Sequence, residues 1–319
     1  MSWLVLGGSG FVGSAVLQAL RSAGIDARSI PAPRLTTSAG TPEALLDAAL
    51  GTDTTALAAA IEGHDVVVNA AGLATPSAAG GKDLLGANAL LPAVLARAAS
   101  AGGARRLVHL SSAAVQGRAP VLDETDTVQP FSAYSRSKAL GEQALDLTAV
   151  REPALSVVTV RATSVQGTGR PTTAALARLA RSPLASVASP GTAPSPITSV
   201  ETLAELVLAL GRYEGPVPAR VLQPWEGLTV RTVLEAAGGH PRALPPALCR
   251  AAVTGGYALS SLLRGRLDGH VRRVELMWFG QDQVPGWAVD QGLAPGARIR
   301  EVLAEAHAAG TGDAVAART

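Results

Sequence analysis

Residues 2–13 read SWLVLGGSGFVG, and this stretch decides the fold. The apolar run at its start predicts a strand, and Gly7, Gly10 and Gly13 form a G-x-x-G-x-x-G turn directly after it. Apolar residues then recur at three- and four-residue steps, which predicts an amphipathic helix that ends at Gly24. Such a turn lets the backbone approach a pyrophosphate, whose charge is met by N–H groups at the helix N-terminus. The residues expected to hold a dinucleotide here are Gly7, Gly10, Phe11, Val12 and Gly13.

The rest of the first half alternates strand-like and helix-like segments, which is typical of an α/β fold with a doubly wound parallel sheet. Further strands are expected at residues 27–30, 65–69, 106–110, 154–160 and 220–222. Helices are expected at residues 84–101, 134–147, 203–210 and 230–237. The pattern loosens after about residue 165, and the Pro-, Ser- and Gly-rich segment 183–196 predicts a loop.

The composition excludes several classes of protein. The chain has 319 residues, of which 47% are hydrophobic and 16% charged, so it is expected to be globular. A net charge of only +2 and the lack of a basic patch interleaved with aromatics argue against a nucleic-acid partner. The single cysteine, Cys249, excludes an internal disulfide, and the five histidines lack metal-ligand spacing. With no signal peptide and no apolar run of membrane-spanning length, a soluble cytoplasmic protein without a membrane partner is expected.

A second motif carries chemistry. Residues 134–138 read YSRSK, so Tyr134 and Lys138 are one helical turn apart on the same face. An ammonium beside a phenol lowers the pKa of the phenol and makes it a proton donor and acceptor near neutral pH. Ser111 and Ser112 follow the predicted strand 106–110, at the edge of a parallel sheet where ligands bind. A serine hydroxyl there can hold the oxygen of a carbonyl or alcohol, whereas Ser111 is expected only to hydrogen-bond at the strand end.

These motifs together resemble those of the extended short-chain dehydrogenase/reductase superfamily, especially its nucleotide-sugar epimerase, dehydratase and reductase branch. The resemblance extends to about residue 305. Besides the glycine turn and the Tyr/Lys pair, the matching segments are Asn69-Ala70-Ala71-Gly72, Asn88, Ser111–Gly117, Arg161–Gly169 and Ile197–Ala204.

The resemblance implies a role for each matching residue. Tyr134 would be the acid/base, Lys138 would lower its pKa and bind the nicotinamide ribose, and Ser112 would orient the carbonyl. Asn88 would order the active site and its water relay, although it could also simply face the edge of the core. Asn69, Ala70, Ala71 and Gly72 would lie beneath the riboses of the cofactor.

The resemblance also implies the domain organisation. Residues 1–165 would form a Rossmann-type NAD(P)-binding domain. Residues 166–310 would form mostly a smaller C-terminal substrate-binding lobe, part of which returns to the core, and residues 311–319 are expected to be a flexible tail. A homodimer is expected through the helices at 84–101 and 133–147, whose alanine-rich second faces suit close packing.

Departures from the family pattern bear on the reaction. Gln116 and Gln166 stand where many members carry tyrosine, which affects the expected contacts to a sugar. A 4,6-dehydratase needs an acid pair beside its catalytic serine or threonine. Ala113 and Ala114 stand there and cannot move protons, so dehydration is not expected.

Cofactor choice depends on the end of the second strand. An NAD enzyme usually carries Asp or Glu about 20 residues after the glycine turn. Residues 30–34 read IPAPR and contain no acid, and Asp26 lies too early. Arg34 could meet the 2′-phosphate of NADP, or it could be a solvated loop residue. NADP(H) is therefore favoured and NAD(H) remains possible.

Three functions fit the sequence. The preferred one is an NADPH-dependent reductase of a small-molecule ketone, in particular a keto group on a nucleotide-linked sugar. A nucleotide-sugar epimerase with tightly bound NAD is the alternative. A cofactor-sensing protein without turnover is the alternative of another class, although such relatives generally lack the Tyr/Lys pair. The substrate contacts lie in the C-terminal lobe, where four arginines either meet a diphosphate or form a solvated surface: Arg264, Arg266, Arg272 and Arg273.

Overall fold

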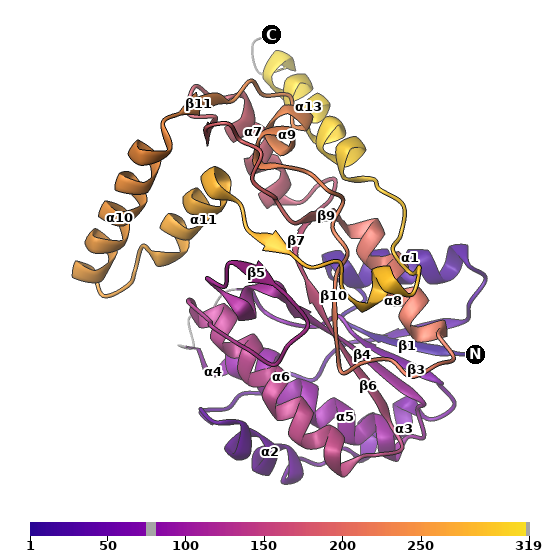
Figure 1. The fold of residues 1–319 in the computed structure, drawn as a ribbon. Helices are drawn as coiled ribbons and strands as arrows, with labels where there is room; N and C mark the ends of the chain where they lie inside the picture. Colours follow the sequence, from indigo (N-terminus) through magenta and orange to yellow (C-terminus); the bar gives the residue numbers. More distant parts are fainter. Residues whose placement is uncertain (75–80, 317–319) are drawn as a thin grey trace.

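The computed structural model describes residues 1–74 and 81–316, and a six-stranded parallel sheet lies at its centre (Figure 1). The spatial order of the strands is β10-β6-β4-β3-β1-β2. Their bounds are β1 Trp3–Leu6, β2 Ala27–Ile30, β3 Val66–Asn69, β4 Arg106–Ser112, β6 Ser156–Ala162 and β10 Arg220–Leu222. All four residues of β1 and of β3 are buried, as expected for strands covered on both faces. The order reverses between β1 and β3, so the crevice at their carboxyl ends is where a ligand is expected.

Helices cover both faces of the sheet, which confirms the doubly wound α/β fold (Figure 1). One face packs against α1 (Phe11–Ser22) and α8 (Val200–Arg212). The other face packs against α3 (Thr55–Ile61), α5 (Leu91–Ala101) and α6 (Ala133–Arg151). The predicted strands and helices of this half differ from the observed ones by a few residues at their ends.

The helix predicted at 84–101 is one continuous element with an irregular middle. It consists of α4 (Lys82–Leu85), a π-helical turn η1 (Gly86–Leu90) and α5. The segment Lys82–Ala101 is long and apolar enough to cross a membrane, with a mean hydropathy of 1.4 over an 18-residue stretch. It is a core helix of this protein, because 72% of that stretch is buried inside the structure. The bent pair α2 (Pro42–Leu50) and α3 also has the length and composition of a membrane span if the two helices are taken as one.

The helix α2 packs on part of the surface of α5 and α6 that was expected to form the dimer contact. Leu45 and Ala49 of α2 pack against Ala93 and Val94 of α5 and against Ala144 of α6. α2 lies below α5 and α6 in Figure 1. Some of the alanines that were expected to meet a second subunit therefore meet a segment of the same chain.

Most of the remaining elements build a lobe beyond the carboxyl ends of the sheet strands, whereas the short helix Trp287–Asp290 packs back on the sheet through Ala288. The remaining elements are η2 Ala113–Gln116, β5 Val121–Leu122, β7 Ser164–Gln166, α7 Pro171–Arg181, β8 Ser186–Ala188, β9 Ile197–Ser199, α9 Val230–Ala236, β11 Arg242–Leu244, α10 Pro246–Leu262, α11 Asp268–Phe279, β12 Asp282–Gln283, α12 Trp287–Asp290 and α13 Ile299–Ala316. Two predictions were wrong in this region. The segment 183–196 contains β8, which pairs with β11. The expected tail 311–319 continues α13 as far as Ala316, and residues 317–319 lie outside the described part of the chain.

Candidate active site

The glycine loop joins β1 to α1 and is folded too tightly for side chains. Gly7 has a φ of +80°, and a Cβ built on it would lie 2.8 Å from the nitrogen of Ala71 and 3.0 Å from the carbonyl carbon of Ala70. A Cβ on Gly13 would lie 2.2 Å from the carbonyl oxygen of Gly7. Gly10 is the N-cap of α1 and provides no side-chain cap, so the first N–H groups of the helix are free to bind an anion. This geometry fits the expected pyrophosphate.

The segment after β3 connects this loop with the proposed catalytic residues. Asn69 is fully buried, and its Oδ1 accepts a hydrogen bond of 3.2 Å from the N–H of Ala71. A Cβ on Gly72 would lie 2.9 Å from Oδ1 of Asn88 and 3.2 Å from Nζ of Lys138. The backbone at Gly72 thus has to pass directly over the lysine, which brings the cofactor crevice and the catalytic helix together.

Two elements bring the expected catalytic residues to one place. Ser112 is the last residue of β4, and Tyr134 and Lys138 lie one turn apart on α6. A capping box, in which the side chains of Ser132 and Ser135 bond each other's backbone N–H, fixes the start of α6. Tyr134 therefore lies in the first helical turn, where its phenol is hydrogen-bonded to the side chain of Ser112.

Lys138 is buried and held by the backbone. Its Nζ donates a hydrogen bond of 2.9 Å to the carbonyl oxygen of Leu110. Burial lowers the pKa of the Lys138 ammonium to about 8, although the nearby Glu142 carboxylate raises it. The lysine therefore changes its charge close to neutral pH. His109, on the preceding strand, is fully buried, and burial together with the Lys138 charge lowers its pKa well below the usual range, so this histidine is neutral.

The charge that acts on the phenol differs from the expectation. Burial raises the pKa of Tyr134, and the opposing influences are the Ser112 hydrogen bond and the positive charge of Arg170. The sequence predicted that the charge of Lys138 would lower the pKa of Tyr134. In the structure the charge that lowers this pKa is that of Arg170, and its influence is smaller than that of burial, which raises the pKa.

Arg170 was not predicted from the sequence. It is the N-cap of α7, and its guanidinium lies 4.7 Å above the ring centre of Phe11 and donates to the carbonyl oxygen of Val165. Phe11 and Val12 are half-buried against the core. The contact links the C-terminal lobe to the glycine loop beside Tyr134. In the sequence, Arg170 is marked only by its place directly after the R-x-x-x-V-x-G-x-G motif of residues 161–169.

Asn88 has a positioning role in this structure. Its Nδ2 donates to the carbonyl oxygen of Leu73 (2.8 Å) and to the hydroxyl of Ser137 (3.0 Å), and its Oδ1 accepts from the N–H of Leu73 (2.9 Å). It lies in the π-helical turn, a distortion that is frequent at functional sites. Asn88 therefore fixes α6 relative to the segment after β3, and its hydrogen bonds go to Leu73 and Ser137.

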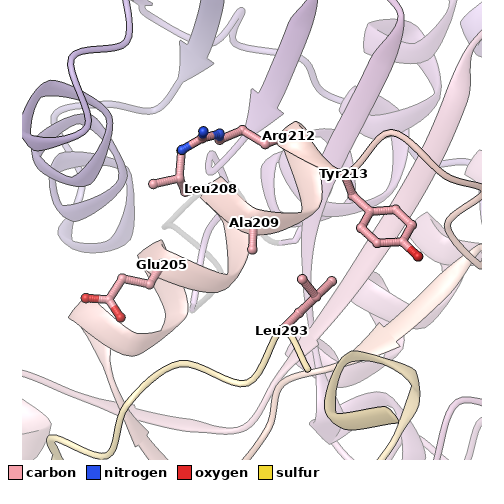
Figure 2. A pocket seen from close by; sticks show the side chains of 6 residues that line it. All are labelled: Glu205, Leu208, Ala209, Arg212, Tyr213 and Leu293. Carbon is pink, nitrogen blue, oxygen red and sulfur yellow. The ribbon is translucent and has the colours of Figure 1, made fainter. Parts of the chain in front are cut away.

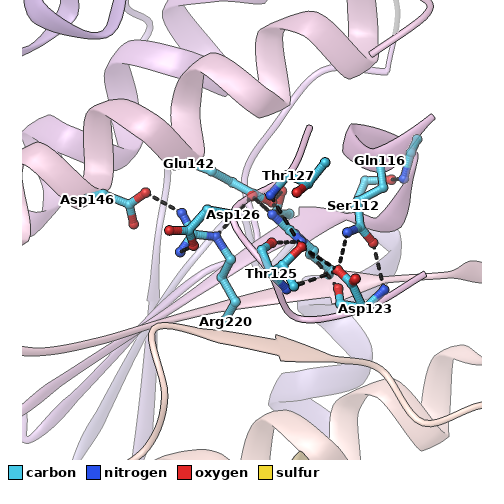
Figure 3. A network of polar contacts seen from close by, with 12 residues as sticks. Ser112, Gln116, Asp123, Thr125, Asp126, Thr127, Glu142, Asp146 and Arg220 are labelled. Carbon is cyan, nitrogen blue, oxygen red and sulfur yellow. Dashed lines mark hydrogen bonds and ion pairs between the residues drawn. The ribbon is translucent and has the colours of Figure 1, made fainter. Parts of the chain in front are cut away.

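A buried ionic cluster lies behind the site (Figure 3). The Glu142 carboxylate accepts from Arg161 (2.8 Å) and from the hydroxyl of Ser111 (2.5 Å). Arg161 and Glu142 are 0% and 1% exposed. Arg220 extends the cluster to Asp146 at the surface. Ser111 thus has the structural role expected of it, and the cluster ties α6 to β4, β6 and β10.

The two glutamines also have structural partners. Gln116 donates to the carboxylate of Asp123 (2.6 Å) and accepts from its N–H (2.9 Å). Gln166 donates to Ser164 (3.0 Å) and accepts from the hydroxyl of Thr173 (2.8 Å). Both amides stabilise loops beside the site, so neither presents a free amide to a sugar.

Arg34 lies four residues after β2 and is exposed. At the end of β2, the hydroxyl of Ser29 lies beside Gly8, where a Cβ on the glycine would come within 2.2 Å of it. Residues 27–41 contain no acid, so no carboxylate of β2 or its following loop is placed to bind ribose hydroxyls.

A hollow elsewhere on the surface does not belong to this site (Figure 2). It has a volume of about 350 Å³ and is lined on α8 and its neighbours by Glu205, Leu208, Ala209, Arg212, Tyr213 and Leu293. None of the expected catalytic or cofactor residues lines it. Among residues 1–74 and 81–316, no group of three or more His, Cys, Asp or Glu could hold a metal ion.

The structure resembles solved nucleotide-sugar enzymes. UDP-glucuronic acid 4-epimerase from Bacillus cereus, in complex with NAD, is 17% identical with a TM-score of 0.64, over 95% of this chain and 96% of that chain. MoeE5, in complex with UDP-glucuronic acid and NAD, is 20% identical with a TM-score of 0.62, over 95% and 97%. A dTDP-4-dehydrorhamnose reductase from Clostridium acetobutylicum is 20% identical with a TM-score of 0.55, over 77% and 83%. No curated protein matches the sequence at a significant level.

The fold and site define a nucleotide-dependent oxidoreductase of the extended short-chain dehydrogenase/reductase type. A model of the NAD dependent epimerase/dehydratase family matches residues 3–212, and the chain belongs to this family. A bound dinucleotide would supply or accept the hydride, and the glycine loop and the Asn69–Gly72 segment have the shape to hold it. Tyr134 and Ser112 lie together where the resemblance predicts the proton donor and the hydroxyl that orients the reacting oxygen.

Proposed function

We propose that this protein reduces the keto group of a nucleotide-linked sugar, or of a similar small ketone, with a hydride from NADPH. The observation that carries the proposal is the convergence of Ser112, Tyr134 and Lys138 beside the glycine loop. Because burial raises the pKa of Tyr134, its phenol is protonated at neutral pH and can donate to the oxygen of a ketone. Relatives of similar fold bind UDP-glucose or UDP-glucuronic acid, which supports the nucleotide-sugar class.

Dehydration is not supported by the residues beside Ser112. Ala113 is buried, and the backbone N–H of Ala114 donates to the Ser112 hydroxyl over 3.2 Å. Neither position carries an acid for an elimination. Epimerisation with retained NAD is the second candidate, and the similarity to NAD-bound epimerases favours it. It would use the same Tyr134, Lys138 and Ser112.

The proposed preference for NADP(H) rests on Arg34 and on the missing carboxylate. Arg34→Ala should weaken NADPH binding by about 10- to 100-fold, because a charge-assisted hydrogen bond to the 2′-phosphate is lost. NADH binding should be nearly unchanged. Titration by fluorescence measures both dissociation constants, and Arg28→Ala, an exposed arginine within β2, is the matched control. Tightly held NAD in the purified protein would contradict the reductase proposal and favour the epimerase.

The rate of ketone reduction should fall as the pH rises through about 8. The Lys138 ammonium is proposed to bind the nicotinamide ribose of the cofactor. Its pKa is about 8, so it carries its charge below that pH and loses it above. Tyr134, whose pKa is raised, keeps its proton throughout this range and adds no second step. A profile of kcat/KM between pH 6.5 and 9.5 in a constant-ionic-strength buffer measures this. A flat profile would show that the Lys138 charge is not required.

The wider setting is proposed from the same considerations. We propose a cytoplasmic enzyme with a small-molecule substrate and no nucleic-acid partner. A homodimer remains the proposed assembly, and any contact through α5 and α6 has to use residues other than Ala93, Val94 and Ala144, which pack against α2.

A further inference from the structure

A helical hairpin extends from the C-terminal lobe and leaves one side of α10 uncovered. α10 and α11 are joined by a short turn at residues 263–267. Figure 1 shows α10 at the outer edge of the molecule, with α11 between it and the other elements. Cys249, Val253 and Ser260 form the buried side of α10. The opposite side faces solvent.

The solvent-facing side of α10 is apolar along its whole length. Leu248, Leu259 and Leu262 are 58%, 50% and 82% exposed. At 3.6 residues per turn, these three leucines fall within an arc of about 60°. The positions between and beside them carry small side chains only, and all are exposed: Ala251, Ala252, Gly255 and Ala258. We refer to these seven residues as the α10 stripe. An exposed apolar stripe of this length indicates a surface that binds another protein or a membrane.

The charged residues of α10 and of the turn after it are all basic. Residues 245–267 contain three arginines and no acid, and the next acid along the chain is Asp268 at the start of α11, whose carboxylate accepts from the hydroxyl of Ser260. Arg250 lies on the other side of α10, where its guanidinium is 5.7 Å from the ring centre of Phe279. Arg264 and Arg266 lie in the turn at the end of the stripe, next to Leu263, which is 44% exposed. Within the described part of the chain, neither Arg264 nor Arg266 forms an ion pair. The hairpin therefore presents leucines and arginines together to solvent.

This pattern argues against a second copy as the occupant. In a parallel pair of α10 helices, Arg264 and Arg266 of one copy would face their own counterparts, which places like charges together. In an antiparallel pair they would lie beside the start of the other α10, and residues 245–267 contain no acid to meet them. Neither arrangement gives the two arginines an opposite charge.

We propose that the α10 stripe and the turn 263–266 dock on an anionic lipid surface. A helix with an apolar face and flanking basic residues lies in the plane of a bilayer interface, and anionic headgroups attract the arginines. The contact is peripheral, because α10 keeps its other face on α11. It revises the expectation that the protein has no membrane partner, and it is independent of the reaction proposed above.

The test is co-flotation of the purified protein with phosphatidylglycerol vesicles and with phosphatidylcholine vesicles. The parent protein should bind the anionic vesicles and lose at least about tenfold in affinity in the double variant Leu259→Glu/Leu262→Glu and in Arg264→Ala/Arg266→Ala. The matched control is Leu184→Glu/Val150→Glu, which alters two residues that are 75% and 80% exposed elsewhere and should bind like the parent. Thermal melting and dinucleotide binding should be unchanged in all three variants.

Two outcomes would overturn the proposal. One is a parent protein that does not float with anionic vesicles, or a control double variant that loses binding as strongly as the α10 variant. The other is a parent dimer, measured by light scattering, that becomes a monomer in Leu259→Glu/Leu262→Glu without any lipid binding. That result would assign the α10 stripe to a second copy of the chain.

Discussion

Replacing Tyr134 with phenylalanine should lower kcat by about 10²- to 10⁴-fold, the usual contribution of a positioned general acid. The variant removes the phenol hydroxyl that is hydrogen-bonded to the side chain of Ser112, while the ring remains. Steady-state turnover of a UDP-linked 4-keto sugar with NADPH measures the effect. Tyr213→Phe is the matched control, because its hydroxyl bonds Gln291 at the surface over 2.9 Å and should have no influence on the rate.

Dinucleotide affinity separates chemistry from folding in this experiment. The Tyr134→Phe protein should bind NADPH within a few-fold of the parent, because the glycine loop and the Gly72 backbone are unchanged. Turnover equal to that of the parent would remove Tyr134 from the mechanism. A loss of both turnover and dinucleotide binding would indicate a damaged fold instead.

The second large effect concerns the buried ionic cluster. Arg161→Met should lower the free energy of unfolding by about 3–5 kcal/mol, because it leaves the Glu142 carboxylate buried without its main partner. Arg161 also donates to the carbonyl oxygen of Thr125 (2.6 Å), which is lost as well. Urea denaturation followed by circular dichroism measures the change.

Two further variants identify the cause of that loss. The double variant Arg161→Met/Glu142→Leu should recover part of the stability, because no unpaired charge remains between α6 and β6. Arg298→Met breaks a pair with Glu205 in which the arginine is 50% exposed, and should cost at most about 1 kcal/mol. If Arg161→Met lowered the free energy of unfolding as little as Arg298→Met does, the Arg161–Glu142 pair would not be what stabilises the cluster.

The parallel sheet could be predicted because two of its central strands, β1 and β3, are short, fully buried and almost entirely apolar runs with glycine or a polar residue at their ends. The run before Gly7 and the run that ends at Asn69 both follow this pattern, and both strands were found within a residue or two. The Tyr134–Lys138 helix could be predicted from its spacing, and its start is explained by the capping box at Ser132.

Other features depend on contacts between distant segments and left no local pattern. Arg170 reaches Phe11 from a loop more than 150 residues away, so its effect on Tyr134 could not be deduced from either segment alone. The packing of α2 on α5 also joins segments that are distant in the sequence. α2 is short, and only the fold shows that Leu45 and Ala49 occupy the face that was expected to meet a partner.

The C-terminal lobe was the least predictable part. Of the four arginines expected either to meet a diphosphate or to form a solvated surface, Arg264 and Arg266 lie in the turn between α10 and α11, and Arg272 and Arg273 lie in α11. Arg272 is buried and bonds Glu275 (2.9 Å) and the carbonyl oxygen of Gly117 (3.0 Å). The four side chains therefore do not form a single diphosphate site.

Deuterium transfer tests the central claim most directly. Parent and Tyr134→Phe proteins are incubated with NADPH deuterated at C4 of the nicotinamide, on the transferred face, and with a UDP-linked 4-keto sugar. The product sugar is then analysed by mass spectrometry. We expect the parent to form a sugar product that carries one deuterium. In the same time, the variant should form almost no labelled product. An unlabelled sugar product from the parent, or equal labelling by both proteins, would contradict hydride transfer assisted by Tyr134.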